Sequence, residues 1–144
     1  LKSVSFDHVF MNPPYFKQNS VKGSHILSSH QARVESMPLS AWISVAKNRC
    51  KPNGKITVIQ RVERLPDIIK CLDGYFGQVT VQPISSFKDT SPKTVIAQAT
   101  KTSGAAFKLL APKIVHRRDG ISGKVVYEDE FKKILRYGHP LQLN

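Results

Sequence analysis

Two consecutive prolines, Pro13 and Pro14, follow the first apolar run of the sequence, residues 5–11. Proline has a fixed φ and no backbone N–H to donate, so a strand inside a sheet cannot run through two of them. The apolar composition of the run favours a buried strand. The sequence therefore predicts a short buried strand that stops at Asn12 and leads into a rigid turn.

Helical and extended patterns alternate along the rest of the chain. Pro38 is typical of a helix start, and apolar residues then recur at helical spacing as far as the turn residues 51–54. The further predicted elements are a strand at 55–60, a helix at 65–72, a strand at 78–82 that Pro83 closes, a strand at 94–100 and a helix at 128–136. Residues 16–36 are polar and predict a long loop, which in compact domains is usually functional or disordered.

Strands that alternate with helices predict an α/β fold with a mostly parallel sheet. The last two strands are joined by a polar loop, residues 85–93, and so predict an antiparallel strand at the edge of that sheet. At 144 residues the chain fits one domain, which we expect to span residues 1–144.

Basic residues outnumber acidic ones by 22 to 10, which gives a net charge of +12 and a pI near 10. This balance favours a polyanionic partner, because neutralising phosphates releases counterions. The alternative is a basic surface that only aids solubility, and charge alone does not separate RNA from DNA or from an anionic membrane. Candidates for phosphate contacts, each with an ordinary solvated charge as the alternative, are Lys17, Lys22, Arg61, Arg64, Lys88 and Lys93. Arg33 is a further candidate for a substrate contact, with a surface ion pair as the alternative.

No apolar run approaches the roughly 18–20 residues that cross a bilayer, so we expect no membrane partner. Cys50 and Cys71 are isolated thiols without metal-ligand spacing, which favours a reduced, cytoplasmic setting. His25 and His30 are five residues apart with no third ligand nearby, and we predict no metal site.

The tetrapeptide Asn12-Pro13-Pro14-Tyr15, directly after a buried strand, resembles the catalytic signature of class I S-adenosylmethionine-dependent amino-methyltransferases. Those enzymes act on adenine N6, cytosine N4 or glutamine N5. An exocyclic amine is a poor nucleophile because its lone pair is delocalised. The side-chain oxygen of Asn12 and the carbonyl of Pro13 can each accept one of its N–H bonds, which directs the lone pair at the donor methyl group. Tyr15 offers a flat ring on which a flipped or unpaired base can stack.

The alternative for this tetrapeptide is a rigid turn in which Tyr15 packs over the edge of the core. Its place at the carboxyl end of a strand in a parallel sheet, where such folds build their sites, favours the catalytic interpretation. The resemblance implies Asn12, Pro13, Pro14 and Tyr15 as catalytic residues. It also implies S-adenosylmethionine as cofactor, with Asn12 as its contact.

Three further segments narrow the resemblance: residues 32–35 (Ala-Arg-Val-Glu), residues 50–54 (Cys-Lys-Pro-Asn-Gly) and residues 63–65 (Glu-Arg-Leu). Together with the tetrapeptide they resemble the carboxyl-terminal half of the bacterial tRNA1(Val) adenine-N6-methyltransferase family. The resemblance covers about Phe6 to Tyr137. It implies a Rossmann-like methyltransferase fold, tRNA as partner and methyl transfer to adenine N6.

The chain departs from that family at its beginning. The family places a glycine-rich donor-binding loop and an acidic ribose-binding residue upstream of this strand, whereas here only five residues precede Phe6 and no Gly-x-Gly occurs. We therefore expect a partial sheet without the amino-terminal donor-binding strands, either a fragment or a shortened gene product. Strand 6–11 would then be an exposed apolar edge, which predicts a homodimer or pairing with a missing amino-terminal segment.

Two other functions stay open at this level. A non-catalytic RNA-binding or dimerising remnant would keep the basic surface without the chemistry. Methylation of a protein glutamine at N5 uses the same tetrapeptide, and the basic charge of the chain favours nucleic acid over this third possibility.

Overall fold

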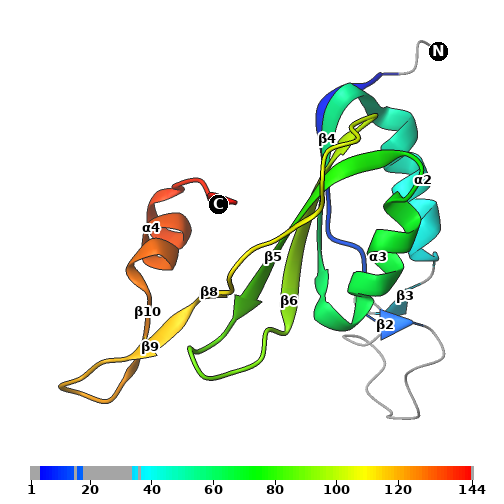
Figure 1. Ribbon diagram of the computed structural model, residues 1–144. Coiled ribbons are helices and arrows are strands. Elements are labelled where there is room, and N and C mark those ends of the chain that lie inside the picture. Colours follow the sequence, from blue (N-terminus) through cyan, green and yellow to red (C-terminus); the bar gives the residue numbers. More distant parts are fainter. Residues whose placement is uncertain (1–3, 15, 18–33, 36, 144) are drawn as a thin grey trace.

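The computed structural model describes residues 4–14, 16–17, 34–35 and 37–143 (Figure 1). In chain order the elements are β1 (Phe6–Met11), β2 (Phe16–Lys17), β3 (Val34–Glu35), α2 (Leu39–Arg49), β4 (Cys50–Arg61), the 3-10 turn η2 (Val62–Arg64), α3 (Leu65–Leu72), β5 (Phe76–Ser85), β6 (Thr94–Lys101), β7 (Lys108–Leu109), β8 (Lys113–Ile114), β9 (His116–Arg118), β10 (Val125–Tyr127) and α4 (Asp129–Tyr137).

Six strands form one mixed sheet in the order β1-β4-β6-β5-β7, with β8 also paired to β5. Strands β1 and β4 are parallel, but β6 is antiparallel to both β4 and β5. The prediction of a mostly parallel sheet with an antiparallel edge strand was therefore wrong. Strand β6 follows β5 without an intervening helix, so it returns in the opposite direction, and it enters the sheet between β4 and β5 instead of adding to its edge.

Pro83 does not end strand β5, as the sequence predicted, because β5 continues to Ser85. The carbonyls of Val81 and Ser85 accept hydrogen bonds from Leu110 and Val115 on the outer side of β5. Backbone groups two residues apart in a strand point to the same side, so Pro83 directs its nitrogen into the gap between β7 and β8. No N–H is needed there, which is how a strand tolerates proline.

The helices predicted after Pro38 and at 65–72 are confirmed as α2 and α3. Both cover one face of the sheet (Figure 1). Pro38 precedes the first turn of α2, and Trp42 is half-buried against the core. The core is apolar and lies between this face and the two helices, where its fully buried members include Ile56, Val58, Ile68, Leu72, Val81 and Val95. Alternate residues of β4 and β6 reach it, as expected for strands with one covered face.

The opposite face of the sheet is more polar. The Nε2 atom of His8 lies 2.7 Å from the hydroxyl oxygen of Thr57, which also accepts a hydrogen bond of 3.1 Å from the Gln98 amide. The amphipathic helix α4 lies on this side of the sheet, opposite α2 and α3 (Figure 1), and none of its residues is buried. Burial by the described residues is therefore concentrated on the face that carries α2 and α3.

Strand β1 forms one edge of the sheet in the described part of the chain. Phe6 is 49% exposed and Phe10 is 62% exposed, whereas Met11 on the helix-covered face is buried. An exposed strand with apolar side chains can pair with a further strand.

The predicted loop at 16–36 lies mostly outside the described residues. Its two described pairs of residues form short strands, β2 and β3, which are parallel to each other. Tyr15, Lys22 and Arg33 are outside the described residues, and for Lys17 only the backbone is described.

No helix in the described ranges is long and apolar enough to cross a membrane. Within the same residues, no three side chains of His, Cys, Asp or Glu gather in an arrangement that could hold a metal ion.

Candidate active site at the carboxyl end of β1

Because β1 and β4 are parallel, the carboxyl ends of both strands lie at the same end of the sheet. Met11 is opposite Val58 in this register, so that Asn12 to Pro14 run beside the last residues of β4. Asn12 is exposed, whereas Pro13 is buried and Pro14 half-buried. The Asn12 side chain is thus the part of the motif, among its described residues, that is most open to a substrate.

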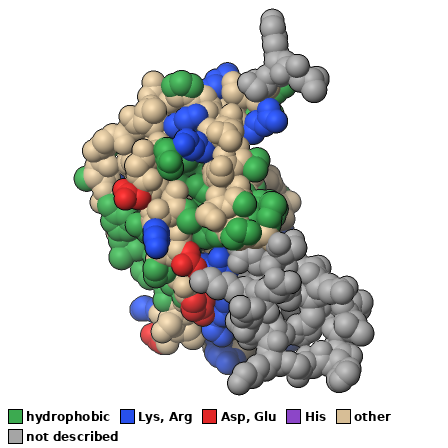
Figure 2. Space-filling view, turned by 90° about the vertical axis from the view of Figure 1, so that its right-hand side faces the viewer, with side chains coloured by type: hydrophobic (Ala, Val, Ile, Leu, Met, Phe, Trp, Pro, Cys, Tyr) green, Lys and Arg blue, Asp and Glu red, His purple; other side chains and the backbone are tan. Residues whose placement is uncertain are grey.

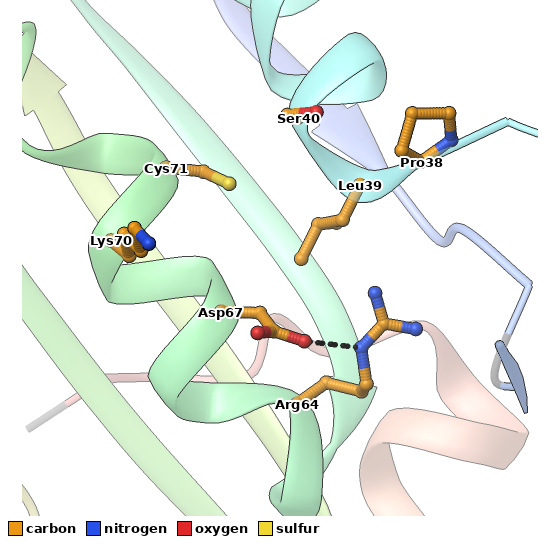
Figure 3. A pocket seen from close by; sticks show the side chains of 7 residues that line it. All are labelled: Pro38, Leu39, Ser40, Arg64, Asp67, Lys70 and Cys71. Carbon is orange, nitrogen blue, oxygen red and sulfur yellow. Dashed lines mark hydrogen bonds and ion pairs between the residues drawn. The ribbon is translucent and has the colours of Figure 1, made fainter.

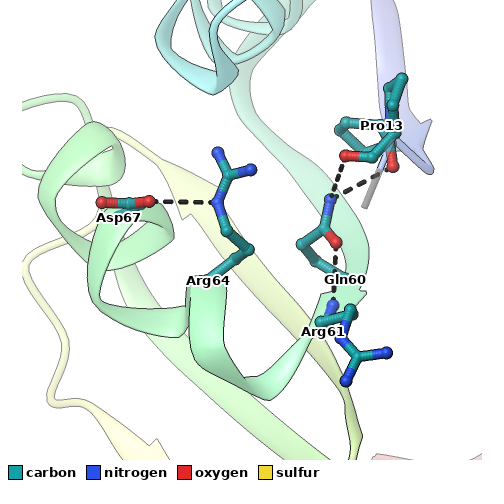
Figure 4. A network of polar contacts seen from close by, with 6 residues as sticks. Pro13, Gln60, Arg61, Arg64 and Asp67 are labelled. Carbon is teal, nitrogen blue, oxygen red and sulfur yellow. Dashed lines mark hydrogen bonds and ion pairs between the residues drawn. The ribbon is translucent and has the colours of Figure 1, made fainter. Parts of the chain in front are cut away.

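Gln60 binds the backbone of the motif (Figure 4). Its side-chain Nε2 donates one hydrogen bond of 3.1 Å to the Pro13 carbonyl and one of 3.2 Å to the Pro14 carbonyl. Its Oε1 accepts a 2.9 Å hydrogen bond from the backbone N–H of Arg61, and the side chain has no exposed surface. All the polar atoms of this buried amide therefore have partners, and together they fix the direction of two consecutive carbonyls.

Sequence reasoning missed Gln60. The available signal was a polar residue at the end of the apolar run 56–59, where a solvated strand end was the simpler interpretation. The Pro13 carbonyl that the sequence assigned to the substrate amine already accepts from Gln60. A carbonyl oxygen has two lone pairs, so one acceptor position remains on Pro13, and Gln60 determines where it points. Pro13 is buried against the described residues, so a substrate amine reaches this position only if neighbouring groups move.

Two of the basic candidates carry local ion pairs. The Arg61 guanidinium donates to both carboxylate oxygens of Glu63 at 3.2 and 3.1 Å, and these hydrogen bonds lower the pKa of Glu63 below its usual value. Arg64 is 7% exposed, and its Nε donates a 3.0 Å hydrogen bond to Asp67 (Figure 4). Both arginines lie at the end of the sheet that carries Asn12. Their positive charges are partly balanced there by the carboxylates of Glu63 and Asp67.

Two further basic candidates, Lys88 and Lys93, lie at the same end of the sheet. The Lys93 carbonyl accepts a 3.1 Å hydrogen bond from the N–H of Val62, which holds the loop between β5 and β6 against the end of β4. Lys88 is in the same loop, and both lysine side chains are exposed. Contact of Lys17, Lys22, Arg33, Arg61, Arg64, Lys88 and Lys93 with nucleic acid stays a prediction.

A small pocket of about 280 Å³ opens between the start of α2 and the length of α3 (Figure 3). Its lining consists of Pro38, Leu39, Ser40, Arg64, Asp67, Lys70 and Cys71. This volume is at the lower limit for small-molecule sites, which occupy roughly 300–1,000 Å³. We therefore assign the pocket no ligand and place the candidate site at the exposed Asn12.

Basic side chains are scattered on the helix-covered side of the molecule. Figure 2 looks onto this side and shows Lys and Arg side chains separated by apolar, acidic and uncharged ones. The described part of this face therefore offers no continuous basic surface.

No family model matches the chain, and no curated protein matches it by sequence. Among solved structures, a predicted O-methyltransferase, Atu636 from Agrobacterium tumefaciens, superposes with a TM-score of 0.68 and 22% identity, over 90% of this chain and 50% of that one. A chain from a type I R-M system superposes with a TM-score of 0.51 and 18% identity, over 94% of this chain and 29% of that one. A complex of M1.HpyAVI with SAM reaches a TM-score of 0.40 at 16% identity, over 85% of this chain and 53% of that one, which is too slight for an inference.

These likenesses concern the fold. The chain spans about half the length of the predicted O-methyltransferase and less of the R-M chain. Its mixed sheet with α2 and α3 on one face is therefore a methyltransferase-like fold.

Proposed function

We propose that this chain supplies the target-amine half of an S-adenosylmethionine-dependent methyltransferase site, and that the amine is adenine N6 in tRNA. The observation that carries the proposal is the exposed Asn12 at the end of β1, beside two carbonyls that Gln60 holds in place. The methyltransferase-like fold supports the reaction class. The net charge of +12 and the resemblance of the motif segments support tRNA as the substrate.

The described residues have distinct parts in the proposed reaction. The donor, when bound, supplies an activated methyl group on a sulfonium. Asn12 Oδ1 accepts one N–H of the adenine amine, and the second acceptor position of the Pro13 carbonyl takes the other. These two hydrogen bonds would direct the nitrogen lone pair at the methyl carbon and stabilise the positive charge that develops on nitrogen. The new N–C bond would replace the S–C bond of the donor, which leaves as a neutral thioether, and the surplus N–H proton would pass to water.

For the donor itself, the chain offers Asn12 as a contact, because this side chain is exposed beside the target amine position. The sequence has no Gly-x-Gly loop of the kind that holds the donor in related folds. We therefore propose that the chain by itself holds the donor only weakly.

Methyl transfer and donor binding test the proposal together. Calorimetry with S-adenosylmethionine is expected to show binding to the protein, and incubation with labelled donor and tRNA is expected to yield N6-methyladenosine on digestion and mass spectrometry. Intact RNA binding without any donor binding would contradict the methyltransferase assignment and leave a non-catalytic RNA-binding protein. Methylation of a protein glutamine in place of tRNA would contradict the substrate.

The β1 edge predicts association through strand addition, either in a homodimer or with an amino-terminal segment. Sedimentation equilibrium is expected to show self-association of the chain that increases with concentration. Phe10→Lys puts a charge on this edge and is expected to weaken association, since charged side chains protect exposed edges. Val45→Lys is the matched control, because Val45 on α2 is 58% exposed and Phe10 is 62% exposed. A monomer at all concentrations, or equal effects of the two variants, would refute self-association through β1.

A further inference from the structure

Four side chains form a row where hairpin β9–β10 meets the loop after β5. The His116 ring stacks on Tyr127, with centroids 4.9 Å apart and an interplanar angle of 30°, and lies 5.7 Å from the Phe87 ring. The Arg118 guanidinium is 6.0 Å from the centroid of Phe87. Tyr127 is 40% exposed and Arg118 is exposed. The row therefore presents aromatic surface next to a cation.

Backbone hydrogen bonds fix this hairpin to the end of the sheet. The N–H groups of Val115 and His116 donate to the carbonyls of Ser85 and Ser86, each at 2.9 Å. Glu128, after β10, donates a further 2.9 Å hydrogen bond to the Val115 carbonyl. The hairpin thus continues from β5 and projects beyond the sheet (Figure 1).

The acidic side chains of the hairpin, Asp119 and Glu128, bind groups within the hairpin itself. Asp119 accepts hydrogen bonds from the N–H groups of Ile121 and Ser122 at 3.2 and 2.7 Å, and these donors lower the pKa of Asp119. Glu128 pairs with Arg117 at 3.6 Å. The exposed cations Arg118 and Lys124 flank the turn. A surface of free cations beside aromatic rings fits a polyanion that also carries flat bases.

The hairpin and Asn12 lie at the same end of the sheet, although at opposite lateral edges. The end of β4 pairs with the start of β6, which in turn pairs with the end of β5, as Arg61, Thr94 and Ile84 are opposite one another. Strand β8, which leads into the hairpin, pairs with the outer side of β5, so the hairpin is at least four strand spacings from β1, about 19 Å. A stacked nucleic-acid strand that rises roughly 3.4 Å per nucleotide would span this separation with about six nucleotides.

We propose that hairpin β9–β10 is a docking surface for the unpaired RNA strand that leads to the target adenine at Asn12. In this arrangement Arg118 and Lys124 contact phosphates, and the exposed ring of Tyr127 stacks on a base. Stacking of this kind needs unpaired bases, because a duplex hides their faces. The assignment of RNA over DNA rests on the proposed function, whereas the hairpin surface itself is a separate claim about binding.

The charge contribution is measured with Arg118→Gln/Lys124→Gln and a labelled single-stranded RNA of 12 nucleotides. Fluorescence anisotropy at several salt concentrations is expected to show binding weakened about tenfold near physiological salt. The slope of log K against log salt should become flatter by about 1.4, because two phosphate contacts on a single strand are lost. Arg49→Gln/Lys70→Gln removes the same two residue types from exposed positions on α2 and α3 and should change neither quantity appreciably.

The aromatic contribution is measured with Tyr127→Leu, which is expected to weaken binding roughly fivefold or more without changing the salt slope. Tyr127→Phe keeps the ring and should bind like the unchanged protein. The docking surface is refuted if Tyr127→Leu and Tyr127→Phe bind the RNA with equal affinity. It is also refuted if Arg118→Gln/Lys124→Gln has the same RNA affinity and salt slope as Arg49→Gln/Lys70→Gln. Equal effects on a DNA strand of the same sequence, with equal starting affinity, would refute the assignment to RNA.

These outcomes separate the two proposals. Hairpin-dependent RNA binding without methyl transfer would overturn the proposed function and leave the docking surface intact. Methyl transfer to tRNA, with RNA binding unchanged in the hairpin variants, would support the proposed function and overturn the docking surface.

Discussion

Replacing Asn12 with alanine is expected to reduce methyl transfer to RNA by at least about a hundredfold, with RNA affinity almost unchanged and donor affinity lowered far less than the rate. The side chain is exposed at the end of β1, so its removal leaves no buried polar group unpaired and should not unfold the chain. Loss of a single hydrogen bond that acts in the transition state, as when one oxyanion-hole donor is removed, costs roughly 10²–10³ in rate. Single-turnover kinetics, with donor and RNA affinities measured separately, would distinguish lost chemistry from lost binding.

Asn48→Ala provides the matched control, because Asn48 is an exposed asparagine on α2, away from the motif. It should transfer methyl groups at the normal rate. Unchanged turnover in Asn12→Ala would refute the proposed role of the Asn12 acceptor, and an equal loss in both variants would show that the substitution acts through the fold.

Gln60→Glu is expected to destabilise the protein by about 3 kcal/mol at neutral pH and to reduce methyl transfer by at least about tenfold. A carboxylate at this buried position would face the carbonyls of Pro13 and Pro14 without a proton to donate, which leaves both without their present donor. Displacement of these carbonyls would also misdirect the acceptor position of Pro13, and small errors in geometry have large effects on rate.

The structure offers a matched control for this variant. Gln82 is equally buried, and its Nε2 also donates to two carbonyls, those of Pro83 at 3.0 Å and Ala111 at 2.7 Å, far from the motif. Gln82→Glu is therefore expected to lower the free energy of unfolding by a similar amount, but to leave methyl transfer by the folded protein unchanged. If Gln82→Glu reduces transfer as much as Gln60→Glu, then Gln60 is only a structural residue.

The destabilisation by Gln60→Glu is also expected to depend on pH. Burial raises the pKa of a carboxyl group above its value of about 4.3 in the unfolded chain, because the charged form is penalised. The protonated carboxyl can donate one hydrogen bond to a carbonyl. The variant should therefore be least destabilised below the unfolded pKa and lose stability as pH rises through the raised folded pKa. Urea unfolding at pH 4 and pH 7 measures this, and equal losses at the two values would contradict it.

The elements that depend on local patterns could be predicted well. Helix α3 has the predicted bounds 65–72, and Pro38 precedes α2 as expected. Strand β1 stops at Met11, before Asn12-Pro13-Pro14. Each of these results follows from residues that are near one another in sequence, through helical periodicity or the missing N–H of proline.

Sheet order could not be predicted in the same way. The loop between β5 and β6 correctly indicated an antiparallel pair, but the insertion of β6 between β4 and β5 depends on which strand edges are available in three dimensions. Pro83 was misjudged for a related reason. Its position in β5 is tolerated because its nitrogen points to a gap between two partner strands, and a gap of this kind exists only in the assembled sheet.

By itself, then, the sequence determined the motif Asn12-Pro13-Pro14, its place after an apolar strand and the basic character of the chain. Only the tertiary structure decided that Gln60, 47 residues beyond Pro13, holds its carbonyl. It alone also brought Phe87 beside His116. Composition and short-range periodicity report local conformation, whereas contacts between distant residues depend on strand order and register, which short sequence patterns do not encode.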